Sequence, residues 1–426
     1  MEVIKYPSRE DWVSLAKRPA LDVTTLFDTV RTVLDEVRQE GDAAVKRYEE
    51  KFDKVRLADL QVSEAEILEA RELVSEDLKQ AIRTAKDNIE KFHASQRFTG
   101  QKVETTSGVT CWQKAVAIEK VGLYVPGGTA PLFSTVLMLA VPAHIAGCKE
   151  IVLCTPPNKE GKVHPAILFA AETAGVSKIF KAGGIQAIAA MAYGTESVPK
   201  VYKIFGPGNQ YVTAAKQLVS LKDVAIDMPA GPSEVEVIAD ETANPDFIAA
   251  DFLSQAEHGA DSQAILVTSC EGIVAPVIKA IQEQLSKLSR KEITEKALEH
   301  SRIIVLKDEL EVIDFTNAYA PEHLIIQTAN YSHIAGQIEN AGSVFMGPYT
   351  PESAGDYASG TNHTLPTNGY AKAYSGVNLD SFIKKITFQE ITAEGIKNLG
   401  GTIQIMAGNE QLDAHRNAVT IRLNTI

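Results

Sequence analysis

In the first hundred residues, the hydrophobic positions recur with the 3.6-residue period of an α-helix. The clearest run spans residues 26–37, and Gly41 interrupts it. A second helical run covers residues 66–89, and it opens where Ser63 and Glu66 have the spacing of a capping box. None of these residues forms a pattern typical of catalysis, so we expect a helical scaffold here.

After residue 116 the pattern changes to short apolar runs that alternate with helical patterns. Such alternation predicts a mostly parallel sheet covered by helices. A turn-rich stretch near Gly231 divides the runs into two groups, so we predict two α/β units of similar construction. The strands of the first unit are expected at residues 121–125, 151–154, 178–180, 201–205 and 224–226, and those of the second unit at residues 235–239, 264–268, 303–306, 323–327 and 343–346.

Beyond Pro366 the pattern is that of a short tail of helix and strand, and residues 418–423 read as its last strand. Its modest size indicates an appendage that packs on something else, such as a partner subunit. The predicted fold class is therefore α/β, with two incomplete Rossmann-like parallel-sheet domains, N-terminal helices and a small C-terminal tail domain.

The stretch SQAEHGADSQ, residues 254–263, joins the end of a helical pattern to an expected strand. Gln255 and His258 are three residues apart, so on a helix their side chains lie about 60° apart on one face and can hold a single ion or ligand. Zinc accepts nitrogen and oxygen ligands together, and a partly open site is typical of catalysis. The alternative is that His258 is an ordinary hydrogen-bonded histidine, since the chain has no CxxC or HExxH motif.

The rest of such a site must come from distant segments. Asp356 lies in a glycine-containing loop, where the alternative is a turn residue that bonds its own backbone. Glu322 and His323 stand just before an expected strand, where both can reach a cleft and act as acid and base, although Glu322 is equally well explained as a solvated residue. Glu410 and His415 would lie about 140° apart on one helix, so they converge only if the helix ends between them.

Three glycine-containing loops follow expected strands of the first unit. They contain Gly127 and Gly128 after Tyr124, Gly183 and Gly184 before Gln186, and Gly206 and Gly208 before Asn209. A turn at a helix N-terminus lets backbone N–H groups approach a phosphate, and ligands of open α/β sheets gather at the carboxyl ends of strands. Each loop alone is explained as a tight turn. Three on one edge favour a phosphate-bearing ligand, although none matches GxGxxG.

The composition is that of an ordinary soluble globular protein. The 426 residues exceed what one core can hold, which agrees with two or more domains. The net charge of −13 argues against a nucleic-acid or anionic-membrane partner, because such partners select basic patches, and it favours a cationic substrate. Neither a membrane span nor a secretory signal is visible in the sequence, so we expect a cytoplasmic protein.

Six longer segments carry a family resemblance: VGLYVPGGTAPLFSTVLMLAVPAHIAGC, KIFGPGNQYVTAAK, DMPAGPSEV, SQAEHGADSQ, PEHLI and PESAGDYASGTNHTLPT. They are similar to segments of the histidinol dehydrogenase family and stand in the same order, from the helices near Leu26 to His415. The resemblance implies a zinc-dependent homodimer that oxidises L-histidinol to L-histidine through L-histidinal. It also implies that two NAD molecules are used in succession, and that this is the last step of histidine biosynthesis.

The resemblance also implies roles by position. The zinc ligands would be Gln255, His258 and Asp356 from one subunit and His415 from the exchanged tail of the other. The NAD-binding residues would be Tyr124, Gln186 and Asn209. The substrate-binding residues would be Ser233, Gln255, His258, His323, Asp356, Glu410 and His415, and the catalytic residues Glu322 and His323.

The chemistry explains these residue types. An alcohol releases hydride only as its hydroxyl proton leaves, so a base must stand beside it, and we expect His323 to be that base. The aldehyde must then be hydrated, which requires an activated water, and Glu322 is the expected base for that step. Zinc would act mainly as a template that anchors the substrate nitrogens.

We expect an N-terminal segment of residues 1–20, followed by a first α/β domain of residues 21–123 and 235–376. Residues 124–234 would form a second, NAD-binding α/β domain. Residues 377–426 would form a small C-terminal domain that contributes to the partner subunit's site.

A zinc hydrolase, with Glu322 activating a water against an ester or amide, is the competing enzyme class. The three glycine loops count against it, because a hydrolase has no use for a dinucleotide. A ligand-binding module without activity is disfavoured, since every site position has a chemically competent side chain. The sequence leaves the choice between zinc and manganese open.

Overall fold

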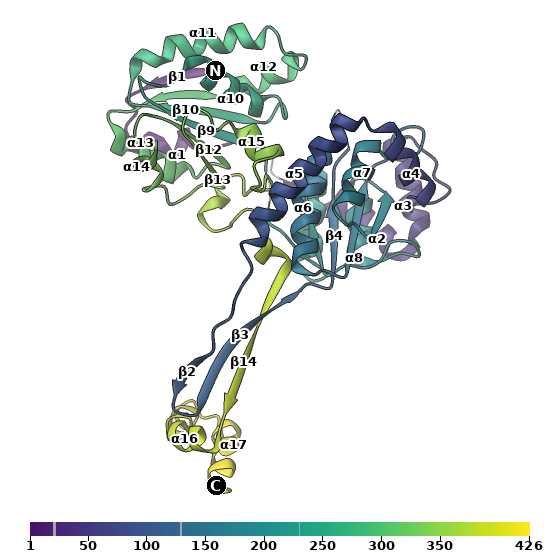
Figure 1. The fold of residues 1–426 in the computed structure, drawn as a ribbon, viewed down its shortest axis with the longest axis vertical. Coiled ribbons are helices and arrows are strands. Elements are labelled where there is room, and N and C mark those ends of the chain that lie inside the picture. The colour runs from purple at the N-terminus through teal and green to yellow at the C-terminus, as the bar shows by residue number, and fades with distance from the viewer. Residues whose placement is uncertain (20–22, 128–129, 230) are drawn as a thin grey trace.

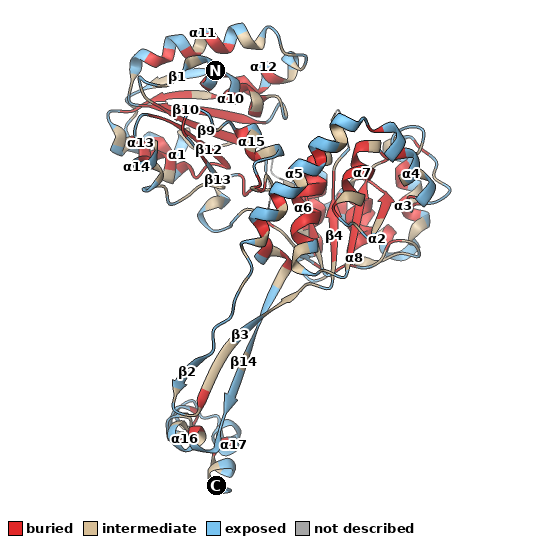
Figure 2. Ribbon diagram, in the orientation of Figure 1, coloured by how far each residue is buried: buried red, intermediate tan, exposed pale blue. Residues whose placement is uncertain are grey.

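Two lobes and a projecting arm make up the molecule (Figure 1). The computed structural model describes residues 1–19, 23–127, 130–229 and 231–426. Each lobe is built on a parallel sheet, and the arm is an antiparallel ribbon that carries two helices at its far end. Figure 2 shows that buried residues concentrate in the two sheets and the helices beside them, whereas the arm is mostly exposed.

The first lobe contains a five-stranded parallel sheet in the order β6-β5-β4-β7-β8. Its strands are β4 (Lys120–Tyr124), β5 (Glu150–Thr155), β6 (Lys178–Lys181), β7 (Lys203–Phe205) and β8 (Ala225–Ile226). Its inner helices are α6 (Phe133–Ala146), α7 (Pro165–Thr173), α8 (Gly184–Tyr193) and α9 (Gln210–Ser220). Helices α6 and α7 cover one face, and α8 and α9 cover the other. Because both faces of the sheet are covered, the strands are mainly apolar apart from charged end residues, and all five expected strands are confirmed.

The N-terminal helices form an outer layer on this first lobe. They are α2 (Phe27–Glu40), α3 (Asp42–Tyr48), α4 (Glu64–Leu73) and α5 (Glu76–Ala94). Helix α2 packs on α8 and α9, α4 packs on α7, and α5 packs on α6. This arrangement differs from the expected grouping of residues 21–123 with residues 235–376, because the apolar stripes of these helices are buried in the two cores of the first lobe.

The helical run expected at residues 66–89 is two helices. The capping box of Ser63 and Glu66 is confirmed at the start of α4. Val74 is extended, and the Ser75 side chain accepts a hydrogen bond from the Leu78 N–H at the start of α5. A second N-cap therefore breaks a run whose hydrophobic period continues across the break.

The second lobe contains a six-stranded parallel sheet in the order β1-β11-β10-β9-β12-β13. Its strands are β1 (Glu2–Lys5), β9 (Glu234–Ala239), β10 (Gln263–Thr268), β11 (Arg302–Val305), β12 (His323–Gln327) and β13 (Ser343–Met346). Helices α10 (Pro245–Ala256), α11 (Val274–Leu285) and α12 (Lys291–His300) cover one face. Helices α1 (Trp12–Leu15), α13 (Glu309–Tyr319) and α14 (Tyr331–Ala335) cover the other.

All five strands expected in the second unit are confirmed, and β1 is an addition that helical periodicity did not predict. This short edge strand obtains its hydrogen bonds from β11, about three hundred residues away. The local sequence pattern therefore does not predict β1.

The arm pairs β3 (Val109–Ala117) with β2 (Val103–Thr106) and β14 (Ile383–Ile391), and it ends in α16 (Ala393–Asn409) and α17 (Asp413–Leu423). The strand expected at residues 418–423 is wrong, because these residues belong to α17. Val419 and Leu423 lie one helical turn apart and both pack on Gly400 of α16. Among the described residues, no helix has the length and apolar character that crossing a bilayer requires.

Candidate active site

The expected metal-binding pair lies at the end of α10, with Gln255 in its last turn and His258 two residues beyond the end of the helix. Gln255 is fully buried, and the backbone N–H of His258 donates to its carbonyl oxygen at 3.2 Å. Gln255 Nε2 donates to Glu322 Oε2 at 3.5 Å, whereas Gln255 Oε1 has no hydrogen-bond partner in the described part of the chain. A buried polar atom without a partner costs about 1–3 kcal/mol, so this oxygen is a candidate ligand for an ion.

Helix α15 (Glu352–Tyr357) packs against α10 and brings two acids to this pair. Candidate ligand atoms of His258, Glu352 and Asp356 lie within 4.8 Å of one another. Asp356 is helical, so it is not the turn residue of the alternative interpretation. Sequence analysis missed Glu352. Its position one helical turn before Asp356 is the signal that would have found it.

Glu322 precedes β12 and His323 is its first residue, and both side chains are buried. Glu322 is therefore not the solvated residue of the alternative interpretation. His323 Nδ1 lies 3.6 Å from Glu322 Oε2, and His323 Nε2 lies 3.6 Å from Asp356 Oδ1. Among the described residues, His323 Nε2 has no hydrogen-bond partner. A free imidazole nitrogen thus stands beside the candidate ligands.

The electrostatics of this cluster are those of a site for a cation. Burial raises the pKa of Glu322 and of Glu352 to about 8. Burial opposes a charge on His323, but the carboxylates around it outweigh burial and raise the pKa of His323 well above its ordinary value. Burial opposes a charge on Asp356 as well, but the close contact with the charge of His323 outweighs burial and lowers the pKa of Asp356. Several carboxyl groups therefore share one imidazole as their counter-charge.

The cluster occupies the amino-terminal edge of the second sheet, opposite the edge where open α/β sheets usually bind ligands. Ser233 precedes β9 at this edge, and its carbonyl oxygen accepts from the Gln263 N–H at 3.1 Å. Strand β9 places Val235 opposite His323 of β12, so Ser233 lies at the level of the residues just before β12. The position of Ser233 is compatible with substrate contact.

Glu410 and His415 lie at the far end of the arm, remote from α15 (Figure 1). Glu410 directly follows α16 and His415 lies in α17, so the two residues are not on one continuous helix, as their convergence requires. Both residues are exposed. Within one chain, the structure does not bring either of them to the cluster.

The first lobe contains a cavity of about 920 Å³ beside the carboxyl ends of its strands. Tyr124, Gln186 and Asn209 all line it, so the three expected cofactor residues share one cavity of the size that small-molecule sites have. The Tyr124 hydroxyl accepts a hydrogen bond from the Gly184 N–H at 3.0 Å. Gly127 also lines the cavity, and Gly128 lies outside the described residues.

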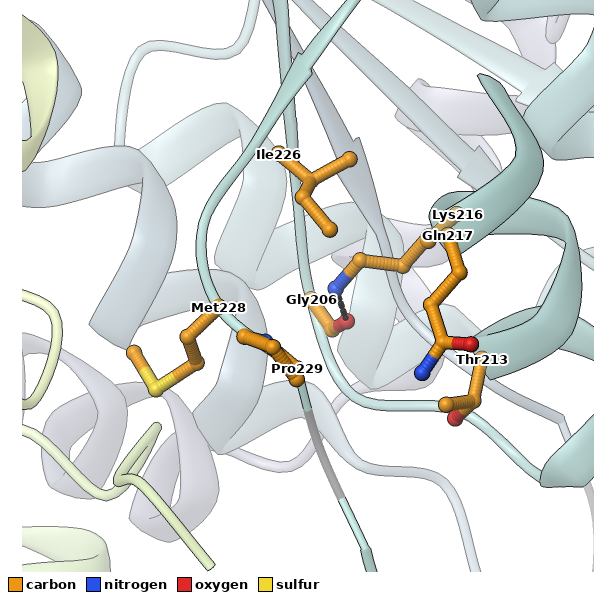
Figure 3. A pocket seen from close by; sticks show the side chains of 8 residues that line it. Gly206, Thr213, Lys216, Gln217, Ile226, Met228 and Pro229 are labelled. Carbon is orange, nitrogen blue, oxygen red and sulfur yellow. Dashed lines mark hydrogen bonds between the residues drawn. The ribbon is translucent and has the colours of Figure 1, made fainter. Parts of the chain in front are cut away.

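A buried ion pair fixes the loop that carries Asn209. Lys216 Nζ donates to the Gly206 carbonyl oxygen at 2.8 Å and pairs with Asp227, as Figure 3 shows in part. Asp227 also accepts from the Gly206 N–H at 2.8 Å. Gly206 has a φ of +125°, and an added Cβ would lie 2.0 Å from the Tyr124 carbonyl oxygen, so only glycine fits there.

His363 connects the cluster to the first lobe. Its Nδ1 is 2.9 Å from the Asp356 carbonyl oxygen, and its Nε2 is 3.0 Å from Thr135 Oγ1 in the first turn of α6. Pro131, four residues before Thr135, lines the 920 Å³ cavity. His363 therefore links the backbone of Asp356 to the first turn of α6, and the chain just before this helix lines the cavity.

Comparison with known proteins is decisive at this point. The family model described as histidinol dehydrogenase matches residues 16–423. The chain belongs to the histidinol dehydrogenase family. It is 71% identical over 426 residues to the histidinol dehydrogenase of Bacteroides thetaiotaomicron, with 100% of both chains covered. It is 52% identical over 415 residues to that of Escherichia coli K12, with 97% of this chain and 95% of the relative covered.

A solved structure supports the same assignment. The crystal structure of histidinol dehydrogenase from Elizabethkingia anophelis matches with a TM-score of 0.98 and 56% sequence identity, and it covers 100% of this chain and 98% of that chain. This member of the histidinol dehydrogenase family is accordingly an oxidoreductase with the family's α/β fold. The expected fold class and enzyme class are both confirmed.

The donor set in this member of the family fits a zinc-like ion. Gln255 Oε1 and both carboxylate oxygens of Glu352 are buried and have no hydrogen-bond partner among the described residues. The exposed His258 imidazole and the partly buried Asp356 carboxylate lie within ligand range of each other. Oxygen and imidazole ligands together are typical of zinc.

Proposed function

We propose that this enzyme oxidises L-histidinol to L-histidine through L-histidinal, by two successive hydride transfers to NAD, as the final step of histidine biosynthesis. One observation carries the proposal. A cluster of imidazole, carboxyl and amide groups has buried atoms without a partner among the described residues, and His363 links it to α6. The chain just before α6 lines the cavity that also contains Tyr124, Gln186 and Asn209. This is the arrangement that a metal-anchored substrate beside a hydride acceptor requires.

Gln255, His258 and Asp356 would hold one Zn²⁺ per subunit, with the partner subunit's His415 as the fourth ligand. The ion supplies a positively charged template that anchors the substrate nitrogens. Its charge would also balance the carboxylates that now raise the pKa of His323, and so bring the imidazole nearer to the neutral form that a base needs.

His323 would act as the base in both oxidations. Its Nε2, free of hydrogen bonds to the described residues, would take the hydroxyl proton of the alcohol as hydride leaves the same carbon. Glu322 would take a proton from the water that adds to the aldehyde. His323 would then take a hydroxyl proton from the resulting hydrate as the second hydride leaves. Tyr124, Gln186 and Asn209 would hold NAD in the cavity, where it would supply the hydride acceptor.

The substrate would be held as a cation. Asp356 and the partner subunit's Glu410 are acids, and a cationic amino alcohol fits the chain's net charge of −13. Ser233 lies at the sheet edge beside the cluster and would add a polar contact.

A homodimer with exchanged arms would complete the site. The arm has exposed apolar side chains at both its strands and its end helices, and such groups are normally covered by a partner. They are Ile386, Ile391, Ile405, Met406, Leu412 and Ile421, which are 40–67% exposed. Since Glu410 and His415 are remote from the cluster of their own chain, a second copy is the natural source of these two groups.

The test is an assay of zinc-loaded protein with L-histidinol and NAD. Two NADH per L-histidine formed, with no free aldehyde accumulating, is the expected result. Consumption of an ester or amide without NADH would instead support the zinc hydrolase, and absence of any reaction would refute both.

A further inference from the structure

A buried acid stands behind the cofactor cavity, and it has no place in the chemistry above. Glu49 begins a single π-helical turn, Glu49–Asp53, that follows α3. Its side chain is completely buried, although nothing in the first hundred residues indicated a functional group. π turns occur frequently beside functional sites.

Glu49 determines the orientation of the Gln186 carboxamide. Gln186 Nε2 donates to Glu49 Oε1 at 2.8 Å, and the Gly183 N–H donates to the same oxygen at 2.9 Å. Because Oε1 already accepts from Gly183, a flipped Gln186 would place two acceptors face to face, which repel. Gln186 must therefore use its NH₂ group on Glu49, and its Oε1 is left as the group without a partner.

Glu49 also occupies the N-terminus of α8. Free N–H groups at a helix N-terminus are a ready phosphate site. In α8 the Gly183 N–H is bound by Glu49 and the Gly184 N–H by the Tyr124 hydroxyl. The second glycine loop, which we expected to approach a phosphate, is thus already satisfied by the protein itself.

We propose that Glu49 is a positioning residue of the dinucleotide site, which fixes Gln186 so that its carboxamide oxygen accepts a hydrogen bond from a ligand donor, an amide or hydroxyl and not a phosphate. This inference rests on the proposed NAD cavity. Asp53 lines the cavity and interacts with Glu49, and burial raises the pKa of Glu49 to about 8, so the acid is largely neutral at pH 7. A neutral carboxyl group is what glutamine reproduces best.

The test is calorimetric titration of NAD into the zinc-loaded enzyme and its variants. Glu49→Ala is expected to weaken NAD binding about tenfold, because the Gln186 carboxamide is no longer held. Glu49→Gln keeps an oxygen that accepts both N–H groups, so its affinity should remain within about threefold of wild type. If Glu49→Ala does not fold, Glu49→Asp takes its place, because its shorter side chain cannot reach both donors.

A double-mutant cycle separates positioning from a structural role. If Glu49 acts through Gln186, adding Glu49→Ala to Gln186→Ala should cost no further affinity. Glu236→Ala is the matched control, since Glu236 is equally buried, has one bonded and one unpartnered oxygen, and lies in the other lobe. It should lower the melting temperature and leave the NAD affinity unchanged.

Unchanged NAD affinity in Glu49→Ala would overturn the inference. The same holds if the double variant loses more NAD affinity than Gln186→Ala alone, or if Glu49→Gln binds NAD as weakly as Glu49→Ala does. Wild-type enzyme that binds no NAD would overturn the proposed function itself, which is a different outcome from normal wild-type binding that the variants leave unaltered.

Discussion

Gln255 is buried at the end of α10 with an oxygen that no described residue satisfies. If that oxygen is a metal ligand, Gln255→Leu should lower zinc affinity at least about tenfold. The same change removes an unsatisfied polar atom, so the metal-free variant should unfold at the same temperature as metal-free wild type or higher. Metal analysis after dialysis, together with thermal unfolding in chelator, measures both effects. A variant that keeps its zinc would exclude Gln255 from the ligand set.

His323 is placed to act on protons without holding the ion. We expect His323→Ala to retain zinc and to lose turnover by about 10²–10⁴-fold, the range that general acid–base catalysis supplies. The measurement is steady-state NADH formation beside zinc content, with His323→Gln as a control for lost packing. Wild-type turnover in His323→Ala would remove this residue from the mechanism.

Glu236 makes stability depend on pH. Burial raises its pKa from the ordinary 4.5 to about 8, so between these values the folded chain keeps a proton that the unfolded chain releases. Its contribution to stability is therefore complete below pH 4.5 and is lost as pH rises toward 8, by roughly 1.4 kcal/mol per pH unit. Glu236→Gln removes this dependence. In denaturant unfolding, the free energy of unfolding of the variant should rise relative to that of wild type from about pH 5 to pH 8. An equal pH dependence in the two proteins would contradict the assignment.

At this scale the sequence predicted what is local. Gln255 and His258 are one helical turn apart, and Glu322 and His323 are neighbours, so spacing alone paired them. Their contact with α15 depends on long-range packing, and only the family resemblance predicted it. Neither local spacing nor the family resemblance indicated Glu49, because its role comes from a contact with Gln186, 137 positions away.

The loop after β7 depends on an ion pair that belongs to two other elements. Lys216 of α9 and Asp227 after β8 are both buried, and together they hold Gly206 by its N–H and carbonyl groups. Lys216→Met leaves an uncompensated buried acid and should cost about 3–5 kcal/mol of stability. Adding Asp227→Asn removes that charge and should restore part of the loss. The measurement is the unfolding midpoint of the single and double variants. A further loss of stability in the double variant would contradict the pairing.

Elements were predictable where burial imposes a simple pattern. Ten of the strands in the two parallel sheets are apolar runs or alternations, and these ten were predicted, whereas the edge strand β1 was not. The arm strands β3 and β14 are only partly buried and alternate weakly, so they had no such pattern. Residues 418–423 alternate like a strand, yet they form a helix because Val419 and Leu423 share a face that packs on α16.

The whole molecule has one feature that a single chain does not explain. The arm extends away from both lobes (Figure 1), and its exposed apolar side chains and His415 have no counterpart in the same chain's cluster. A symmetric dimer with exchanged arms would cover these apolar side chains and would bring His415 to the cluster of the partner chain. In such a dimer, each active site would need residues from both chains.

Mixing inactive variants tests this exchange. His415→Ala removes the residue supplied by the arm, and Glu322→Gln removes a residue of the cluster, so each homodimer should be inactive. In a mixed dimer with exchanged arms, one site receives an intact cluster and an intact arm, whereas the other receives both defects. Random reassociation makes half of the dimers mixed, so about a quarter of the wild-type activity should return. If each arm served its own chain, every site in the mixture would carry one defect, and no activity would return after dissociation and reassembly.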